Sequence, residues 1–204
     1  MAASRQFSVM EADRLRDELA AMGMLRDSQE WTTLGTGAMN PETQLRISMR
    51  PYLAADAPLL AEVFRASIEE LTGEDYGPGQ QRAWASLADD ETAFAERLQR
   101  SLTLVGLFDS APVAFISLAD ASRLDMLYVH PGAAGQGIAT MLVDAIEKLA
   151  AARGISRLSA DVSDNAQEFF RRRGFHPRQR NSIPLGREWL ANTTMERVLK
   201  EEAK

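Results

Sequence analysis

The sequence predicts a mixed α/β fold with a central, mostly antiparallel sheet flanked by helices, and two observations indicate this class. Three runs with strand composition, residues 102–108, 112–118 and 123–129, follow one another with only short links between them. Short links join antiparallel neighbours, because a parallel pair needs a long crossover. From residue 130 onward, segments with helical and strand patterns alternate, which adds helices to that sheet.

Residues 1–45 are expected to form an N-terminal extension. Apolar side chains at Leu15, Leu19 and Met22 share one face of a predicted helix. Residues 27–44 have the Gly, Thr, Asn and Pro content of a linker. Residues 46–204 are the expected domain proper, and a translation start at Met39 would leave most of the extension out of the native protein.

The domain is expected to begin with a strand over residues 45–53 and a helix over residues 54–73, with Asp56 near the helix start. Helical patterns recur before the three strands, and in the second of them Asp89 or Asp90 can cap the first turn. The further elements are helices over 78–87, 90–101, 140–154 and 165–174, a strand over 157–162, and closing strands over 175–185 and 188–199.

Composition excludes several classes of function. The 204 residues suit one domain with an appendage, and the net charge of -6 argues against a nucleic-acid partner. No cysteine is present, which excludes disulfides, thiolate metal sites and cysteine nucleophiles. No apolar run reaches the ~20 residues of a membrane span. Because the N-terminus also lacks the apolar core of a signal peptide, we expect no membrane partner and a cytoplasmic location.

The chemistry is concentrated in HPGAAGQGIAT, where Gly132, Gly135 and Gly137 precede a helix. A glycine-rich turn at a helix N-terminus presents unpaired N–H groups and the positive end of the helix dipole to an anion, above all a phosphate. A Walker loop is excluded, because no lysine follows the last glycine. A dinucleotide fingerprint would use Asp161 as its ribose-binding acid, but Thr140 stands at its third glycine position.

The stretch LYVHPGAAGQGIATMLVDAIEKLAAARG, followed by SDNAQEFFRRRGF, resembles the GNAT superfamily of acyl-CoA-dependent N-acetyltransferases over residues 46–199. Residues 134–139 align with the family's pyrophosphate loop, Q/R-x-x-G-x-G/A, except that Ala134 stands where the family has Gln or Arg. The resemblance implies a GNAT fold, in which the fourth and fifth strands splay apart around acetyl-CoA as co-substrate. It implies acetyl-CoA contacts at Leu127, Tyr128, Val129, Ala134, Gly135, Gln136, Gly137, Ile138, Ala139, Thr140, Asn165, Phe169 and Phe170.

The resemblance also implies direct attack of a primary amine on the thioester in a ternary complex. At pH 7, deprotonating a lysine-like amine costs about 4–5 kcal/mol, whereas releasing a thiol as thiolate costs about 2 kcal/mol, so a base matters more than an acid. Asp125 is the candidate base, because a two-residue period puts it on one face with Leu127 and Val129. The other interpretation of Asp125 is a strand-end charge paired with an arginine. Phe170 stands where the family often has its tyrosine acid, so water or Tyr128 would donate that proton.

Tyr76 and Trp84 lie in the region that walls the acceptor pocket in this family, and they are the candidate acceptor-binding residues. The acceptor is expected to be a small-molecule or peptide amine, and the acidic balance of residues 54–100 favours a cationic one. His130 and His176 are expected to be structural, and no metal site is predicted. Two alternatives remain: a CoA-binding sensor without turnover, suggested by Phe170, and a module that docks a partner or a homodimer copy through residues 1–45.

Overall fold

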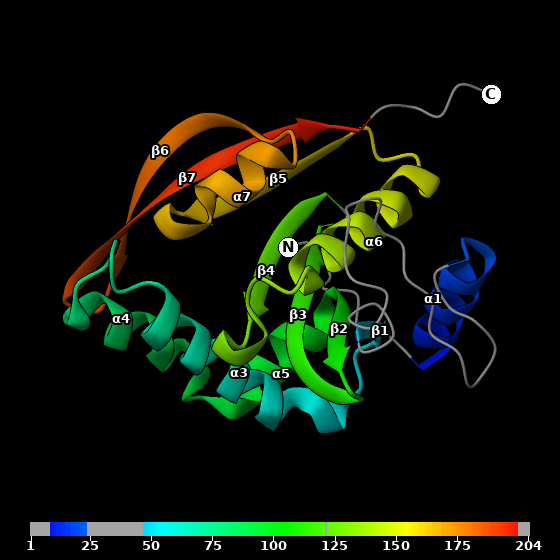
Figure 1. Ribbon diagram of the computed structural model, residues 1–204, viewed down its shortest axis with the longest axis horizontal. Coiled ribbons are helices and arrows are strands. Elements are labelled where there is room, and N and C mark those ends of the chain that lie inside the picture. Colours follow the sequence, from blue (N-terminus) through cyan, green and yellow to red (C-terminus); the bar gives the residue numbers. More distant parts are fainter. Residues whose placement is uncertain (1–8, 24–46, 121, 200–204) are drawn as a thin grey trace, which may run out of the picture.

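The computed structural model describes residues 9–23, 47–120 and 122–199. Seven strands form one sheet in the order β1-β2-β3-β4-β5-β7-β6 (Figure 1). Only β4 and β5 are parallel neighbours, and the other pairs are antiparallel, so the predicted class is confirmed. The strands are β1 (Ile47–Pro51), β2 (Leu102–Phe108), β3 (Ala111–Ala119), β4 (Arg123–Val129), β5 (Arg157–Ser163), β6 (His176–Leu185) and β7 (Glu188–Val198).

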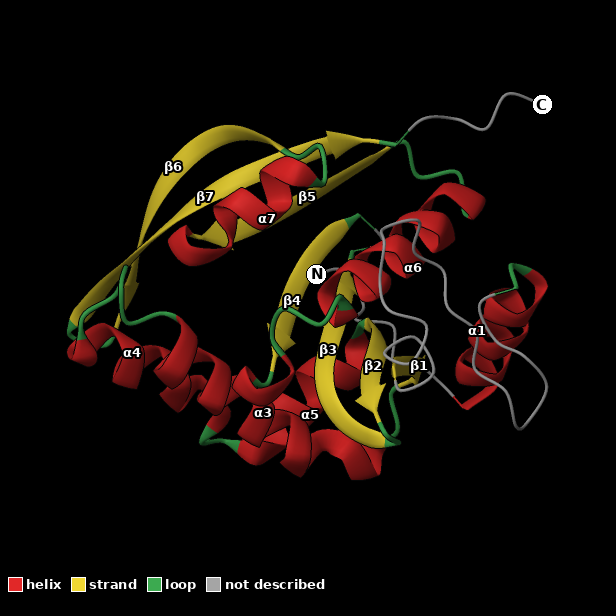
Figure 2. Ribbon diagram, in the orientation of Figure 1, coloured by secondary structure: helices red, strands yellow, loops and turns green. Residues whose placement is uncertain are grey.

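The helices lie in layers on both sides of the sheet (Figure 2). On one side, which we call the α6 face, α6 and α7 pack on the larger buried cluster. On the other side, the α3 face, α3, α4 and α5 pack on a second cluster around Phe64, Phe94 and Phe115. The helices are α1 (Val9–Ala21), α3 (Ala57–Leu71), α4 (Pro78–Ala85), α5 (Glu91–Arg100), α6 (Ile138–Ala152) and α7 (Gln167–Arg172), with single turns η1 (Ala54–Asp56), η2 (Ser86–Ala88), η3 (Pro131–Ala133) and η4 (Asp164–Ala166).

The first turn of α6 lies directly on the sheet because Gly106 of β2 has no side chain. A Cβ built at Gly106 would stand 2.7 Å from Cγ2 of Ile138 and 3.2 Å from Cβ of Ala114. Both distances are shorter than ordinary van der Waals contact. The glycine therefore fixes how closely the N-terminus of α6 approaches β2 and β3.

Three local predictions are confirmed: the short link after residue 108, the aspartate cap of α5 and the place of Asp56 near a helix start. Asp109 and Ser110 both have positive φ, 49° and 69°, as a tight two-residue hairpin between β2 and β3 requires. Asp90 caps α5 by accepting a hydrogen bond from a backbone N–H of its first turn. The Asp56 carboxylate accepts from the N–H of Leu53, the N-cap residue of η1, at 2.8 Å, and it also binds both terminal nitrogens of Arg50 at 2.6 and 2.7 Å.

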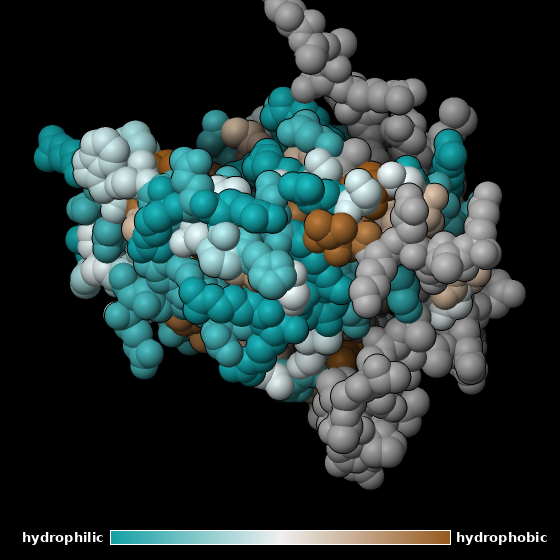
Figure 3. Space-filling view, turned by 90° about the horizontal axis from the view of Figure 1, so that it is seen from above, coloured by the Kyte–Doolittle hydropathy of each residue, from teal (hydrophilic) through white to brown (hydrophobic). Residues whose placement is uncertain are grey.

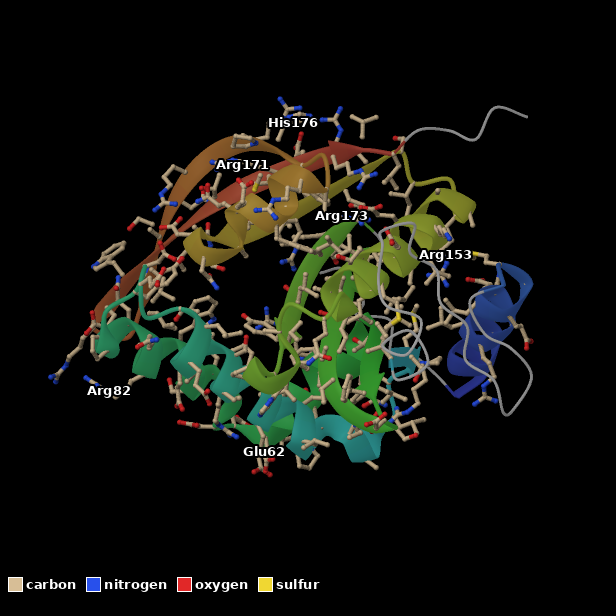
Figure 4. The ribbon with its side chains drawn as sticks, in the orientation of Figure 1. Glu62, Arg82, Arg153, Arg171, Arg173 and His176 are labelled. Atoms are coloured by element: carbon tan, nitrogen blue, oxygen red, sulfur yellow. The ribbon has the colours of Figure 1, made fainter. Side chains whose placement is uncertain are left out.

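The predicted N-terminal helix is α1, and its apolar face packs on the domain. Leu15 and Leu19 are buried in the same cluster as α6. At the other end of α6, Arg153 extends toward α1 (Figure 4) and its Nη2 lies 2.7 Å from Oε2 of Glu18. α1 is thus joined to the α6 layer by apolar packing and an ion pair. The linker predicted over residues 27–44 and the alternative start at Met39 lie outside the described residues.

One of the two edge strands of the sheet is β6, which is exposed along most of its length. Its residues include Pro177, Arg178, Arg180 and Pro184. Seen from above in Figure 3, this end of the molecule is mostly hydrophilic. Prolines and charges on an edge strand oppose pairing with another sheet, so this edge is poorly suited to strand addition.

Candidate functional site

The central feature is a fork between β4 and β5. The two strands are in register only at Arg123 with Ser159 and Leu124 with Ala160, although each strand has seven residues. Beyond Leu124 they diverge, as Figure 1 shows, which is the predicted splayed pair. The backbone of β4 at residues 127–129 therefore has no β5 partner in the register, and a ligand with amide groups can pair with it.

The glycine loop leads from the end of β4 to the N-terminus of α6. Gly135 and Gly137 have φ of 75° and 85°, in the left-handed region that favours glycine. Gly137 is the N-cap residue of α6 and provides no side-chain cap. The first N–H groups of the helix are thus available to a ligand, and the helix dipole favours an anion there.

The space beside this loop is open. A Cβ built at Gly135 meets no protein atom within 4 Å. An uncapped helix start, two left-handed glycines and open space on the loop fit a diphosphate such as that of CoA. These features concern the backbone, so the fit does not depend on the side chain at position 134.

The side chains of the loop contribute mainly to the fold. Ile138 is 1% exposed and belongs to the α6-face cluster. The amide of Gln136 donates to the carbonyl of Gly132 at 3.3 Å, and the N–H of Ala134 donates to a carbonyl of η3. Ala139 and Thr140 are half-buried in the first turn of α6. Of the predicted loop contacts, the backbone N–H groups are therefore the ones suited to an anion.

Asp125 does not share a face with Leu127 and Val129, so that prediction is wrong. Ser117 of β3 pairs with Met126, and the next residue of β3 pairs with Leu124. Asp125 has no partner between them and is the extra residue of a β-bulge. Leu127 and Val129 pack against the cluster of the α6 face. The carboxylate of Asp125 instead points to α5, on the α3 face. A two-residue period fails across a bulge, because the extra residue changes the alternation.

Two arginines hold the Asp125 carboxylate. Oδ2 accepts from Nε of Arg97 at 2.7 Å, and Oδ1 accepts from Nη1 of Arg123 at 2.8 Å. The Asp125 side chain is 6% exposed. Burial alone would raise the pKa of Asp125, but the hydrogen bonds and charges of the two arginines outweigh it and lower that pKa. The arginine-paired interpretation of Asp125 is therefore the one that matches the geometry, and such a carboxylate is a weak base.

Tyr128 lies at the centre of a row of aromatic side chains on the α3 face. Its ring centroid is 4.5 Å from that of Phe64, 5.6 Å from that of Phe115 and 6.3 Å from that of Trp84. Burial raises the pKa of Tyr128, although a hydrogen bond with Trp84 opposes that shift. The phenol consequently keeps its proton at neutral pH and can donate a hydrogen bond.

Tyr76 continues the aromatic row, with its ring centroid 5.3 Å from that of Trp84. The side chain is 3% exposed, and its hydroxyl donates to the carbonyl of Ala191 in β7 at 2.6 Å. The same hydroxyl accepts from the N–H of Asp164 at 2.9 Å. Tyr76 thus joins the loop between α3 and α4 to the β5–β7 side of the fork. Trp84 is half-buried, so it is the more accessible of the two candidate acceptor residues.

The segment after β5 places the remaining predicted residues. Asn165 is exposed in η4, and its amide lies 3.4 Å from the carbonyl of Leu71. Phe169 is half-buried on α7. Phe170 is 5% exposed and packs edge-on against Phe169 and Phe175, with centroids 5.4 and 5.1 Å away. Phe170 is therefore a core residue as well as the position at which the family often has its acid.

The two histidines occupy different places: His130 is a turn residue at the start of the glycine loop, and His176 lies far from the fork. Nδ1 of His130 accepts from the N–H of Gly132 at 3.2 Å, as expected of a turn residue. His176 lies at the top of Figure 4, on β6, and β7 and β5 separate that strand from β4. Within the described ranges, no group of three His, Asp or Glu could hold a metal ion. Nor does any helix in those ranges combine the length and the apolar composition needed to cross a membrane.

Sequence reasoning did not single out Arg97. Its partner, Asp125, is 28 residues away, and the pair forms only because the bulge turns Asp125 toward α5. An arginine on an amphipathic helix is an ordinary solvated residue by pattern alone. No local signal in the sequence could have identified it.

Comparisons with known proteins agree with this geometry. A family model described as "Acetyltransferase (GNAT) domain" matches residues 72–199. The "Uncharacterized N-acetyltransferase YafP" of Escherichia coli (strain K12) is 30% identical over 149 residues, which are 73% of this chain and 94% of that protein.

Solved structures are similar as well. A GCN5-related N-acetyltransferase structure from Rhodopseudomonas palustris, also described as "Aminotransferase, Class-II", is 50% identical with a TM-score of 0.75, and the match covers 81% of this chain and 100% of that one. The PaiA N-acetyltransferase of Thermoplasma acidophilum, solved in complex with coenzyme A, is 21% identical with a TM-score of 0.63 over 74% of this chain and 98% of that one. At that identity the second likeness concerns the fold alone.

Proposed function

The chain belongs to the GNAT acetyltransferase family, and from that premise we propose that it transfers an acetyl group from acetyl-CoA to a primary amine by direct attack. The thioester supplies the acetyl group. In the transfer, a C–N bond forms at the acceptor nitrogen, the C–S bond breaks, and one proton leaves the amine while one is taken up by the thiolate.

The observation that carries this proposal is the combination of the fork with the glycine loop. The N–H groups of residues 135–139 would hold the diphosphate at the uncapped start of α6. The unpaired edge of β4 at residues 127–129 would align the amide-containing arm beside it. A backbone N–H on that edge can also stabilise the negative charge that develops on the acetyl oxygen.

The side chains on the α3 face would organise the acceptor rather than take its proton. Asp125 is bound by two arginines and has a lowered pKa, so we assign the proton of the attacking amine to water. Tyr128, whose pKa is raised by burial, would act as a hydrogen-bond donor at the fork. Trp84, next to Tyr128, would contact the apolar part of the acceptor.

One observation favours a second candidate, a CoA-binding domain without turnover. Phe170 cannot donate a proton to the leaving thiolate, and it is packed in the core. Thiolate release costs only about 2 kcal/mol at neutral pH, so the missing acid is compatible with turnover. The two candidates therefore differ in turnover and not in CoA binding.

The test is a thiol-release screen with acetyl-CoA over a library of primary amines, run with calorimetry of CoA binding. The proposed function requires both binding and amine-dependent thiol release. Binding without release from any amine would favour the second candidate. A Tyr128→Phe variant that binds CoA normally but has a lower kcat would support a hydrogen-bond donor role for Tyr128. An unchanged kcat would contradict that role.

A further inference from the structure

Arg97 presents unused hydrogen-bond donors beside the fork. It is bound to Asp125 through Nε alone. Among the described residues, none accepts a hydrogen bond from Nη1 or Nη2 of Arg97. Arg50 differs in this respect, because its Nη1 and Nη2 both donate hydrogen bonds to the carboxylate of Asp56.

The carboxylate behind Arg97 fixes the direction of its free end. Asp125 has a side-chain exposure of 6%, the lowest of any carboxylate in the described ion pairs, whereas Arg97 is 44% exposed. A buried carboxylate bound to Nε orients the planar guanidinium, and the outer edge formed by Nη1 and Nη2 is a separate edge from the one that Asp125 contacts. Two parallel N–H donors of this kind match a carboxylate bidentately.

The charge at this point is positive. One carboxylate, Asp125, faces two guanidinium groups, those of Arg97 and Arg123. A second carboxylate, that of Asp120, lies 3.9 Å from Arg123 but is 84% exposed, so solvent screens its charge. One buried carboxylate does not neutralise two guanidinium groups, so a net positive charge remains at this point.

Arg97 also lies where an acceptor would come. Asp125 follows directly after Leu124, the last β4 residue in register with β5, so the pair stands at the point where the fork opens. It is on the α3 face, opposite the glycine loop of α6. The charge of Arg97 also acts on Tyr128, the central ring of the aromatic row.

We infer that Arg97 binds a carboxylate of the acceptor, so that the acceptor class is an amine that carries a carboxylate on the same small molecule, as a free amino acid does. This inference rests on the proposed function, because it names the substrate of the same site. The amine would lie at the fork and the carboxylate at the Nη groups of Arg97, with Asp125 as the positioning residue.

The test compares L-amino acids with their C-terminal amides as acceptors at saturating acetyl-CoA. The wild-type protein is expected to favour the acids. Arg97→Gln is expected to lower the preference for acids, measured as kcat/KM for the acid divided by kcat/KM for its amide, about 10- to 100-fold, the effect of losing a charged hydrogen-bond partner. Arg97→Lys, which keeps the charge without the paired donors, should lie between the two.

Arg100→Gln is the matched control. Arg100 is on the same helix and is similarly exposed at 47%, and its one ion pair among the described residues is with Glu96 of the same helix, at 3.5 Å. The Arg100→Gln variant should keep the wild-type preference for acids over amides. Thermal unfolding and CoA calorimetry check that each variant is folded, and calorimetry with N-acetyl amino acids against their amides measures carboxylate binding without turnover.

The outcomes separate the two proposals. Equal rates for acids and amides, or a preference that survives Arg97→Gln, would overturn the inference and leave acetyl transfer standing. No thiol release from any amine would overturn the proposed function. In that event, N-acetyl amino acid binding that disappears in Arg97→Gln would still support a carboxylate site.

Discussion

Replacing Gly135 by alanine separates backbone strain from loss of the ligand site. Gly135 has φ of 75°, and a Cβ built there lies within 4 Å of no protein atom. The cost of an alanine to the folded protein is therefore the strain of the left-handed backbone and not a steric clash. That conformation costs an alanine about 1–2 kcal/mol. Gly154, just after the end of α6, has the same φ of 75° and the same open surroundings. Gly154→Ala is therefore a control with equal strain at the opposite end of the same helix.

Both variants should lose about 1–2 kcal/mol of unfolding free energy, which lowers Tm by about 2–8 °C in a protein of this size. Only Gly135→Ala places a methyl group in the space beside the loop N–H groups. Losing one charge-assisted hydrogen bond costs about 1.5–3 kcal/mol, so its Kd for CoA should rise about 10- to 150-fold by calorimetry. If both variants bind CoA as tightly as each other, the glycine loop is not the diphosphate site.

Three further outcomes are expected. Gly106→Ala forces its methyl against Ile138, so it should destabilise the protein by about 1–3 kcal/mol in denaturant unfolding; a neutral result would mean that α6 does not rest on β2 as described. Tyr76→Phe leaves a buried carbonyl and N–H without their partner, which should cost about 1–3 kcal/mol and raise KM for the acceptor, whereas CoA affinity should stay unchanged. The folded-state pKa of Asp125 lies below its ordinary value of 3.8, so its carboxylate stabilises the fold above that pH, and this contribution is lost as the pH falls through the folded pKa. Asp125→Asn should therefore be less stable than wild type at neutral pH, with a difference that shrinks below about pH 4; a difference independent of pH would contradict the assignment.

The sequence predicted what local chemistry determines. The turn at Asp109 and Ser110 and the cap at Asp90 depend on residues at most three apart, and both are as expected. The glycine loop is also local, because left-handed backbone before a helix start requires glycine at fixed positions. These features place the expected CoA site on α6 without any knowledge of the tertiary contacts.

The acceptor side depends on contacts that the sequence does not encode locally. The hydroxyl of Tyr76 donates a hydrogen bond to a carbonyl 115 residues away, and no sequence pattern near Tyr76 indicates that partner. Asp56 binds the N–H of Leu53 at a helix start, as its local position suggests, but its carboxylate also binds Arg50, which β1 brings alongside. The local partner of such a side chain can be predicted from the pattern of residue types, whereas its second partner depends on tertiary geometry.

The bulge at Asp125 is the most consequential feature that the sequence conceals. One extra residue in β4 turns a carboxylate from the α6 face to the α3 face, at the point where β4 leaves β5. Without the bulge, Asp125 would stand on the face of Leu127 and Val129, far from α5, and Arg97 would have no buried partner. Bulges re-aim side chains next to active sites, and here the re-aimed carboxylate, directly after the last residue paired with β5, orients the guanidinium of Arg97. The two substrates would then be bound on opposite faces of one strand, the nucleotide by main-chain N–H groups and the acceptor by side chains.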